Sequence, residues 1–161
     1  MTDRWRIAVA ADNAGVALKD TLAALMRDDD RVAEVTDFGV PDDSDDRAYP
    51  LLGLAAAQAV ADGRADRAVL VCGTGIGMAI SANKVEGVRA TVAHDSYSAE
   101  RSITSNDCQV LCMGGRVIGP ELAKKIVEEW LGHEFDPSSA SADKVAHITA
   151  YEQGHEDPAA G

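Results

Sequence analysis

The chain has 161 residues, of which 46% are apolar and 26% charged, the balance of one globular domain with a sizeable core rather than of a disordered segment. Its formal net charge of −12 argues against nucleic acid or an anionic membrane as a partner. An acidic protein that binds an anionic ligand must gather its few cations locally or use backbone N–H groups.

No apolar run approaches the ~18 residues of a membrane span, and the run at residues 7–11 is too short for a secretory signal. We therefore expect a cytoplasmic protein. The cysteines Cys72, Cys108 and Cys112 are odd in number and lack the spacing of a disulfide framework. Because the CxxxC pair at 108–112 has no second pair, no zinc site is expected, and these two cysteines fit buried small side chains.

Short apolar runs alternate with helical patterns along the chain, which is typical of a parallel α/β sheet. The pattern predicts strands at residues 7–11, 35–38, 67–71, 88–93 and 110–113. It predicts helices over 15–26, 50–62, 78–84, 96–105, 120–131 and 144–153, with Pro50 and Pro120 in first turns and Gly132 closing the fifth helix. The last residues, 154–161, are expected to be frayed.

This order of elements predicts an α/β fold, a Rossmann-like three-layer sandwich with a five-stranded parallel sheet and a C-terminal helix extension. Neither an internal repeat nor a linker divides the chain, so residues 1–161 are expected to form one domain. A polar stretch at 137–142 separates the last helix from the sheet. That helix can dock on its own core or on a partner subunit.

In open parallel sheets, ligands bind beyond the carboxyl ends of the strands. Four predicted strand ends carry small or polar residues, which makes this edge the expected place for a site: Asp12-Asn13, Cys72-Gly73-Thr74, His94-Asp95 and Gly114-Gly115-Arg116.

Three glycines follow the third predicted strand within the segment 73–77. At a strand-to-helix junction, glycines let backbone N–H groups point inward at the start of a helix, where they bind an anion. The same residues also suit a plain tight turn. The spacing GxGxG is neither the dinucleotide pattern GxGxxG nor the phosphate loop GxxxxGK[ST], so a nucleotide-binding fingerprint is poorly supported.

Cys72 directly precedes these donors. A thiol in that position ionises more readily than a free one and suits a base or a nucleophile, whereas many strand cysteines are simply buried and inert. A thiol phosphatase would need an arginine six residues after the cysteine, where this chain has Met78.

The other candidates each allow a binding role and a structural one. Asp12 can bind sugar hydroxyls or cap the next helix, and His94 can be a ligand or a polar strand terminus. Arg116 suits phosphate or a solvated surface. Asn106 can reach a pocket or cap a helix, and Thr74 offers a hydroxyl over the glycine turn.

Four segments together resemble the type B ribose-5-phosphate isomerases and the related galactose-6-phosphate isomerase subunits: AADNAG, CGTGIGMAISANK, SND and GGRVIGPELAKKIVEEWL. The resemblance runs from about residue 5 to 153. It implies an aldose–ketose isomerase of a small phosphorylated sugar that uses neither metal nor cofactor. It also implies a homodimer or homotetramer with active sites built across the subunit interface, residues 137–155 packing on the partner.

The resemblance further implies residue roles. Cys72 matches the base that moves a proton between C1 and C2, and Thr74 matches a residue that helps transfer the hydroxyl proton. The other matches are groups that bind the substrate or stabilise the enediolate: Asp12, Tyr49, Gly73, Gly75, Ile76, Gly77, Asn106 and Arg116. Stabilisation of that oxyanion by oriented N–H donors lets a thiolate suffice as base.

The chain departs from the family pattern at several places. Asn13 stands where relatives carry histidine, and Ser105 replaces the histidine that opens the furanose ring. Ala140 and Lys144 replace two phosphate-binding arginines. Asn13 and Lys144 remain substrate-binding candidates, and His94 is a candidate replacement for the ring opener.

The missing histidine suggests a substrate that needs no ring opening. A four-carbon sugar 4-phosphate cannot close a furanose because its O4 is esterified, so D-erythrulose 4-phosphate with D-erythrose 4-phosphate is one predicted pair. Ribose 5-phosphate with ribulose 5-phosphate is the conventional one. A sugar-phosphate-binding or regulatory paralogue without activity, and a nucleotide-binding protein, are the rival classes.

Overall fold

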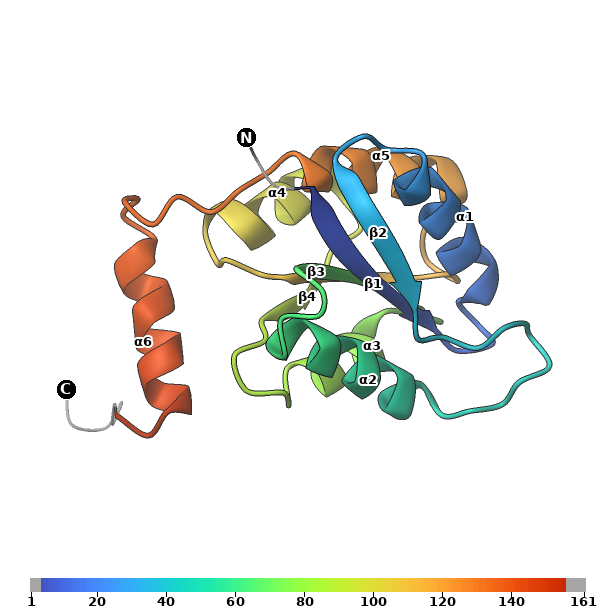
Figure 1. The fold of residues 1–161 in the computed structure, drawn as a ribbon, viewed down its shortest axis with the longest axis horizontal. Coiled ribbons are helices and arrows are strands. Elements are labelled where there is room, and N and C mark those ends of the chain that lie inside the picture. Colours follow the sequence, from blue (N-terminus) through green and yellow to red (C-terminus); the bar gives the residue numbers. More distant parts are fainter. Residues whose placement is uncertain (1–3, 156–161) are drawn as a thin grey trace.

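In the computed structural model, which describes residues 4–155, a five-stranded parallel sheet lies between two layers of helices (Figure 1). The strands are β1 (Trp5–Ala11), β2 (Val32–Asp37), β3 (Arg67–Cys72), β4 (Ala90–Val92) and β5 (Val110–Gly114). The helices are α1 (Val16–Arg27), α2 (Tyr49–Ala61), α3 (Ile76–Ala82), α4 (Ser96–Thr104), α5 (Pro120–Leu131) and α6 (Ala142–Glu152). The predicted three-layer sandwich with a C-terminal helix is confirmed.

The alternation of side chains along each strand explains the layers. Val9 and Val71 pack in the cluster that α1, α4 and α5 cover, whereas Ala10, Leu70 and Cys72 belong to the cluster under α2 and α3. Successive residues of a strand point to opposite faces, and both faces of the central strands are covered, so residues 7–11 of β1 and 68–72 of β3 are all apolar and buried, whereas the edge strand β2 is largely exposed. Cys72 therefore lies on the α2–α3 side of the sheet.

The strand order is β2-β1-β3-β5-β4, and every neighbouring pair is parallel. The chain leaves β1 towards β2 on one side and continues from β3 towards β5 and β4 on the other, so the order reverses between β1 and β3. At such a reversal, the loops beyond the strands diverge and leave room for a ligand. Asp12 and Cys72 come from these two neighbouring strands.

Several boundaries differ from the predicted ones. β2 begins at Val32 rather than at residue 35, because its pairing with β1 starts at Trp5↔Val32. β4 is shorter than predicted, because it is an edge strand that pairs with β5 alone, from Ala90↔Val110 to Val92↔Cys112. Gly132 does end α5, but its φ of −87° is not the left-handed cap that glycine usually supplies there.

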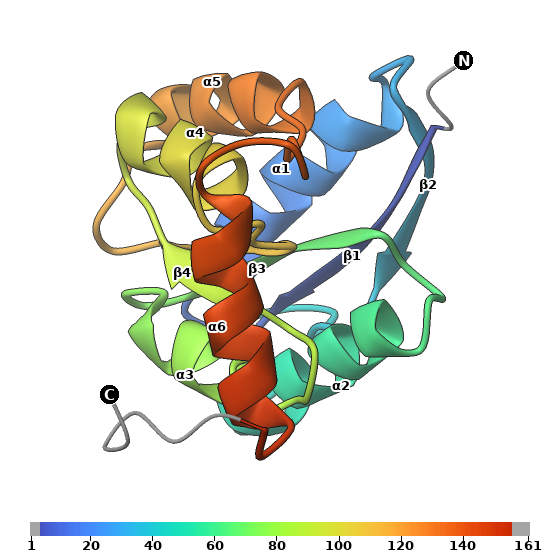
Figure 2. The ribbon, with the colours of Figure 1, turned by 90° about the vertical axis from the view of Figure 1, so that its left-hand side faces the viewer.

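Helix α6 stands away from the sandwich on a loop (Figures 1 and 2). Of its side chains, only that of Val145 is buried, while Ile148 and Tyr151 are 52% and 63% exposed. Its last residue, Glu152, accepts a hydrogen bond from the Gly87 N–H at 2.9 Å. Within one chain, α6 therefore does not dock its apolar face on its own core. The predicted frayed end lies, beyond residue 155, outside the described residues.

No helix within residues 4–155 is both long enough and apolar enough to cross a membrane.

Candidate active site

The loop between β3 and α3 is fixed by Gly75. This glycine has a φ of +80°, and a Cβ there would lie 2.9 Å from the backbone carbonyl carbon of Met113. Only glycine meets both demands without strain. The resulting turn directs the Gly75 N–H at the sulfur of Cys72, with 3.1 Å between N and Sγ. The predicted inward-facing backbone donor is present, and its partner in this structure is the cysteine.

Cys72 differs from the other two cysteines in its surroundings. It ends β3 and is 5% exposed, beside the open side of the loop where Thr74 is exposed. Burial raises the pKa of Cys108 to about 11 and raises that of Cys112 further. Those two thiols stay protonated near neutral pH. Cys112 is a buried residue of β5 as predicted, whereas Cys108 precedes that strand and is only partly buried, because it lies in the turn that leads into β5.

Two further predicted residues lie against this loop. The ring of Tyr49 packs so closely on Gly77 that a Cβ there would approach its Cε2 to 2.3 Å. The Arg116 side chain folds over Gly73, and the Arg116 N–H donates to the Gly73 carbonyl at 3.0 Å. An aromatic ring and a guanidinium thus flank the glycine turn. Ile76, which belongs to the turn, is exposed. This arrangement suits a small ligand with an anionic group.

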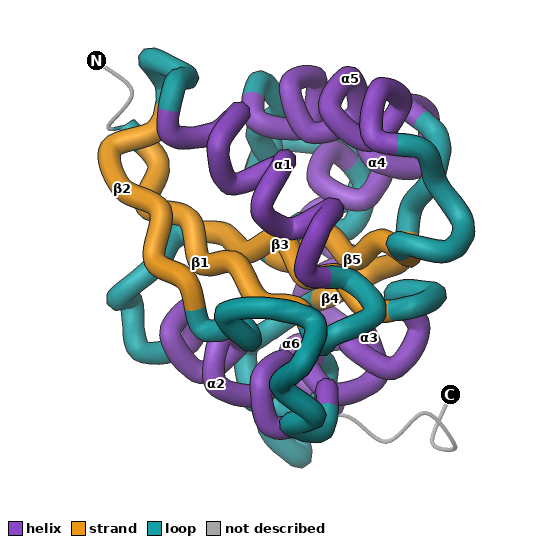
Figure 3. The backbone as a smooth tube through the Cα atoms, turned by 90° about the vertical axis from the view of Figure 1, so that its right-hand side faces the viewer, coloured by secondary structure: helices purple, strands orange, loops and turns teal. Residues whose placement is uncertain are grey.

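The loop after β1 is held by Asp12. Its Oδ1 accepts hydrogen bonds from the N–H groups of Ala14 and Gly15 at 3.1 and 3.2 Å, so the carboxylate does orient the turn before α1. Gly115 lies against the same turn, because a Cβ there would be 2.9 Å from the Ala14 oxygen. The next residue, Asn13, is exposed. The loops after β1, β3 and β5 therefore meet at one edge of the sheet (Figure 3).

His94 follows β4 and is tied to the same edge. Its Nε2 accepts a hydrogen bond from the Gly114 N–H at 2.8 Å, so that nitrogen carries no proton. Partial burial holds the pKa of His94 below its usual range, against the opposing effect of Asp95. The imidazole is neutral and one of its nitrogens is already used, which limits it as a ring-opening acid.

This bond predicts a pH effect. The unfolded chain protonates His94 near pH ~6.5, whereas the folded protein does so at lower pH, so the unfolded state binds more protons in the interval between. Stability should therefore fall as the pH drops from 7 through that interval. In His94→Gln, whose amide oxygen can accept the same N–H without titrating, this part of the fall should disappear. Thermal melts between pH 5 and 8 measure it; superimposable profiles would contradict it.

Asn106 and Lys144 are not brought to Cys72. Asn106 precedes β5, whereas Cys72 ends the neighbouring parallel strand β3, in register with Gly114 at the other end of β5. Lys144 is exposed on α6, which Figure 1 places on the side where the strands begin. Within one chain, the predicted residues thus form two separate groups.

The sequence analysis did not single out Arg101. Its guanidinium donates a hydrogen bond to the Ser105 hydroxyl, one helical turn further on. The i, i+4 spacing of an arginine and a serine on a predicted helix was the available signal.

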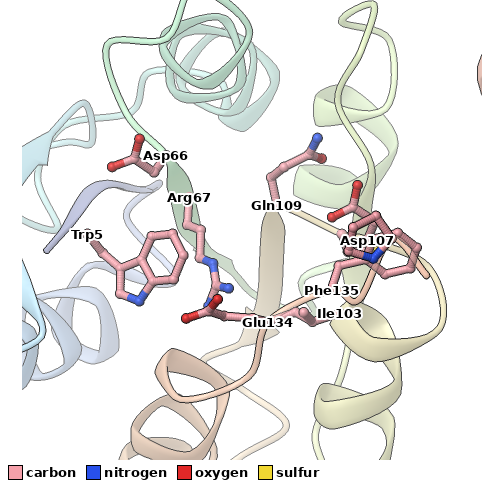
Figure 4. Close-up of a pocket in the computed structure, with 10 residues that line it drawn as sticks. Trp5, Asp66, Arg67, Ile103, Asp107, Gln109, Glu134 and Phe135 are labelled. Carbon is pink, nitrogen blue, oxygen red and sulfur yellow. The ribbon is translucent and has the colours of Figure 1, made fainter. Parts of the chain in front are cut away.

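A cavity of about 330 Å³ lies at the opposite edge of the sheet (Figure 4). Its buried cation, Arg67, lies 3.9 Å from the centre of the Trp5 ring and donates hydrogen bonds to the carbonyls of Trp130 and His133 at 3.0 and 2.5 Å. These carbonyls are at the end of α5, so Arg67 adds side-chain donors to the cap that the Gly132 N–H provides. Burial lowers the pKa of Arg67 to about 10. A structural role accounts for this residue.

No group of three His, Cys, Asp or Glu side chains among residues 4–155 is arranged to hold a metal ion.

Known proteins resemble this chain in sequence and in fold. A sequence model of the ribose/galactose isomerase family matches residues 7–148. The chain is 57% identical to D-erythrulose-4-phosphate isomerase 2 of Mycolicibacterium smegmatis, over 91% of this chain and 97% of that one. It is 45% identical to D-erythrulose-4-phosphate isomerase of Pectobacterium atrosepticum, over 91% and 94%. The structure of ribose-5-phosphate isomerase B from Clostridium thermocellum superimposes with a TM-score of 0.86 at 39% identity, over 94% of this chain and 99% of that one.

The fold and the glycine-lined strand edge define an isomerase of phosphorylated sugars of the aldose–ketose type. The chain belongs to the ribose/galactose isomerase family. The predicted family and enzyme class are confirmed.

Proposed function

We propose that this enzyme interconverts D-erythrulose 4-phosphate and D-erythrose 4-phosphate, with Cys72 as the base. The observation that carries the chemistry is the Gly75 N–H directed at the Cys72 sulfur, at the edge of the sheet where strand order reverses. The observation that carries the choice of substrate is Ser105 in the position of the ring-opening histidine. The names of the two erythrulose-phosphate isomerases, at 57% and 45% identity, support the same choice.

The mechanism is a proton transfer through an enediolate. The Cys72 thiolate removes a proton from C1 of the ketose, and the electron pair moves onto the carbonyl oxygen at C2. Backbone N–H groups of residues 73–77 stabilise this oxyanion, for which several kcal/mol is usual. The thiol returns the proton to C2, while Thr74 helps to move the hydroxyl proton from O1 to O2. Because Cys72 is only 5% exposed, the substrate must approach its sulfur past Thr74 and the glycine turn.

Ser105 cannot replace a ring-opening acid. Its oxygen accepts a hydrogen bond from Arg101, and a serine hydroxyl does not titrate near neutral pH. Ribose 5-phosphate exists largely as a closed furanose and needs that step, whereas a tetrose 4-phosphate does not. The open-chain substrate therefore fits the side chains at this position better.

The test is a comparison of kcat/KM for D-erythrulose 4-phosphate and for ribose 5-phosphate. We expect at least a ~10-fold preference for the four-carbon substrate, since loss of one well-placed acid–base group costs 10²–10⁴-fold. A preference of the parent enzyme for ribose 5-phosphate would contradict the proposal.

We further propose that residues 1–161 form one domain and that two copies of it complete each active site. Two kinds of observation support this arrangement. Asn106 and Lys144 lie away from Cys72 in one chain, and α6 leaves Ile148 and Tyr151 exposed. In a dimer, residues 137–155 of one copy would pack on the other and bring Lys144 near the Arg116 phosphate position. A monomer in light scattering at full activity would contradict it.

We also place the enzyme in the cytoplasm, where its three free cysteines, Cys72, Cys108 and Cys112, would stay reduced. Fractionation of the source cells tests this placement.

A further inference from the structure

The end of α4 carries a guanidinium whose charge is incompletely neutralised. Arg101 donates to the neutral Ser105 hydroxyl, and its ion-pair contact with Glu100 is loose, at 3.8 Å. The Arg101 side chain is 44% exposed. A guanidinium has five N–H donors, and among the described residues the hydrogen bonds of this one go to Ser105 alone. Donors therefore remain for a ligand.

The turn after Arg101 is held by several side-chain hydrogen bonds. The Asn106 side-chain amide donates to the Arg101 carbonyl at 3.0 Å. Asp107 has a φ of +49°, an uncommon conformation for a residue other than glycine. Arg89 holds this turn by donating to the carbonyls of Asn106 and Asp107 at 3.1 and 2.9 Å and to the Asp107 carboxylate at 2.6 Å. These bonds fix the backbone that carries Asn106 next to Arg101.

Arg101 and Asn106 line the same cavity, which has a volume of about 480 Å³ and lies between α4, β4 and α6. Arg89 and Asn83 also line it, and none of the described lining residues is acidic. Arg89 is paired with Asp107 at 2.6 Å, so among the described lining residues Arg101 carries the charge that remains open to an anion. Ile148 of α6 forms one wall, so the cavity faces the helix that we expect to reach a partner.

We infer that Arg101 binds the phosphate of the substrate held over the partner's Cys72 and thereby selects a four-carbon sugar. The inference rests on the proposed function, because it places Asn106 and Arg101 at the partner's active site. It also explains how phosphate is held although Ala140 and Lys144 replace two family arginines. A guanidinium binds phosphate through paired hydrogen bonds, a geometry that a lysine does not reproduce.

The selection follows from length and charge. In a four-carbon substrate, the phosphate is one carbon nearer to C1 and C2 than it is in a pentose 5-phosphate. We therefore place it nearer to the turn that contains Asn106. Ser105 orients the guanidinium by accepting its hydrogen bond. A histidine at 105 would instead place two cationic groups together, which disfavours the protonated imidazole that opens a ring. Arg101 with Ser105 is thus an alternative to a ring-opening histidine.

The test uses Arg101→Leu, with Arg64→Leu as the matched control, because Arg64 is 55% exposed and pairs with Asp62 at 3.1 Å. In Arg101→Leu, the KM for D-erythrulose 4-phosphate and the Ki of inorganic phosphate should both rise by ~10–100-fold, the usual effect of losing charge-assisted hydrogen bonds. Arg64→Leu should change neither. Arg101→Lys, which keeps the charge and is the milder change for folding, should give an intermediate rise in both.

Ser105→Ala separates binding from positioning. It removes the hydroxyl that accepts the hydrogen bond from Arg101 but keeps the guanidinium. The Ki of phosphate should therefore rise less than in Arg101→Leu. Equal Ki values for phosphate in the parent enzyme and in Arg101→Leu would overturn the inference, and so would a parent enzyme that phosphate does not inhibit. If the parent enzyme turns over D-erythrulose 4-phosphate in either case, the proposed function survives and only the role of Arg101 fails.

Co-expression of Cys72→Ala with Arg101→Leu tests the shared site. Random pairing makes half of the dimers mixed, and each mixed dimer has one site with both parent residues, so about a quarter of the parent activity should return. If both residues served the same chain's site, no site would be restored. Activity no higher than the sum of the separate variants would overturn the placement of Arg101 at the partner's Cys72.

Discussion

Replacing Cys72 by alanine is expected to lower kcat on D-erythrulose 4-phosphate by about 10²–10⁴-fold, the range for loss of a general base. The side chain is small and ends a buried strand, so the fold should survive the change. The Gly75 N–H would lose its sulfur acceptor, but the glycine turn would still bind the substrate. KM should therefore change much less than kcat, which steady-state kinetics measures directly.

Cys108→Ala is the matched control. It removes a thiol from the same chain, but one whose pKa burial raises to about 11 and which lies before β5, at the end of the sheet away from Cys72. Its kcat should stay within about twofold of the parent. If Cys72→Ala were as active as Cys108→Ala, the thiol would not be the base.

Gly75→Ala is the second change with a large expected effect. A Cβ at this φ of +80° costs roughly 1–2 kcal/mol, and the contact with Met113 forces the loop to move. The oxyanion donors then lose their alignment, so kcat should fall about 10²–10³-fold, as for loss of one oxyanion donor. Enzyme kinetics and thermal melting together measure both consequences.

Gly63→Ala is the control that separates the effect of backbone strain on stability from the effect of a displaced active-site loop on kcat. Gly63 also has a positive φ, +71°, but a Cβ there meets nothing within 4 Å, and the residue follows α2 away from Cys72. This variant should lose roughly 1–2 kcal/mol of stability from the positive φ alone, without loss of kcat. An equal loss of kcat in both glycine variants would show that destabilisation alone explains the effect.

The sheet and its functional edge could be predicted because their signals are local. Apolar runs such as 67–71 mark strands buried on both faces, and the glycines of 73–77 mark the turn that follows. Tyr49 and Arg116 were predicted from the family resemblance, and the structure places both against that turn. The location of the site at this edge could be predicted from the topology, because parallel strands bring their carboxyl ends to one edge of the sheet.

The other features depend on contacts between distant segments. Gly132 ends α5 as predicted, but the sequence did not reveal that Arg67, from the start of β3, also binds the carbonyls at that end. The early start of β2 depends on its pairing with β1. Asn106 lies near the start of β5, whereas Cys72 lies beside its end, and this separates the two residues. The family motif lists both residues without stating their positions along the strand.

The role of Cys72 can be tested most directly by proton exchange in D₂O. With D-erythrulose 4-phosphate and the parent enzyme, NMR should show deuterium incorporated at C1 of the ketose and at C2 of the aldose. With Cys72→Ala, incorporation should fall to the rate without enzyme. Deuterium incorporation by Cys72→Ala at the parent rate, or no incorporation and no turnover by the parent enzyme with any four- or five-carbon sugar phosphate, would contradict the account.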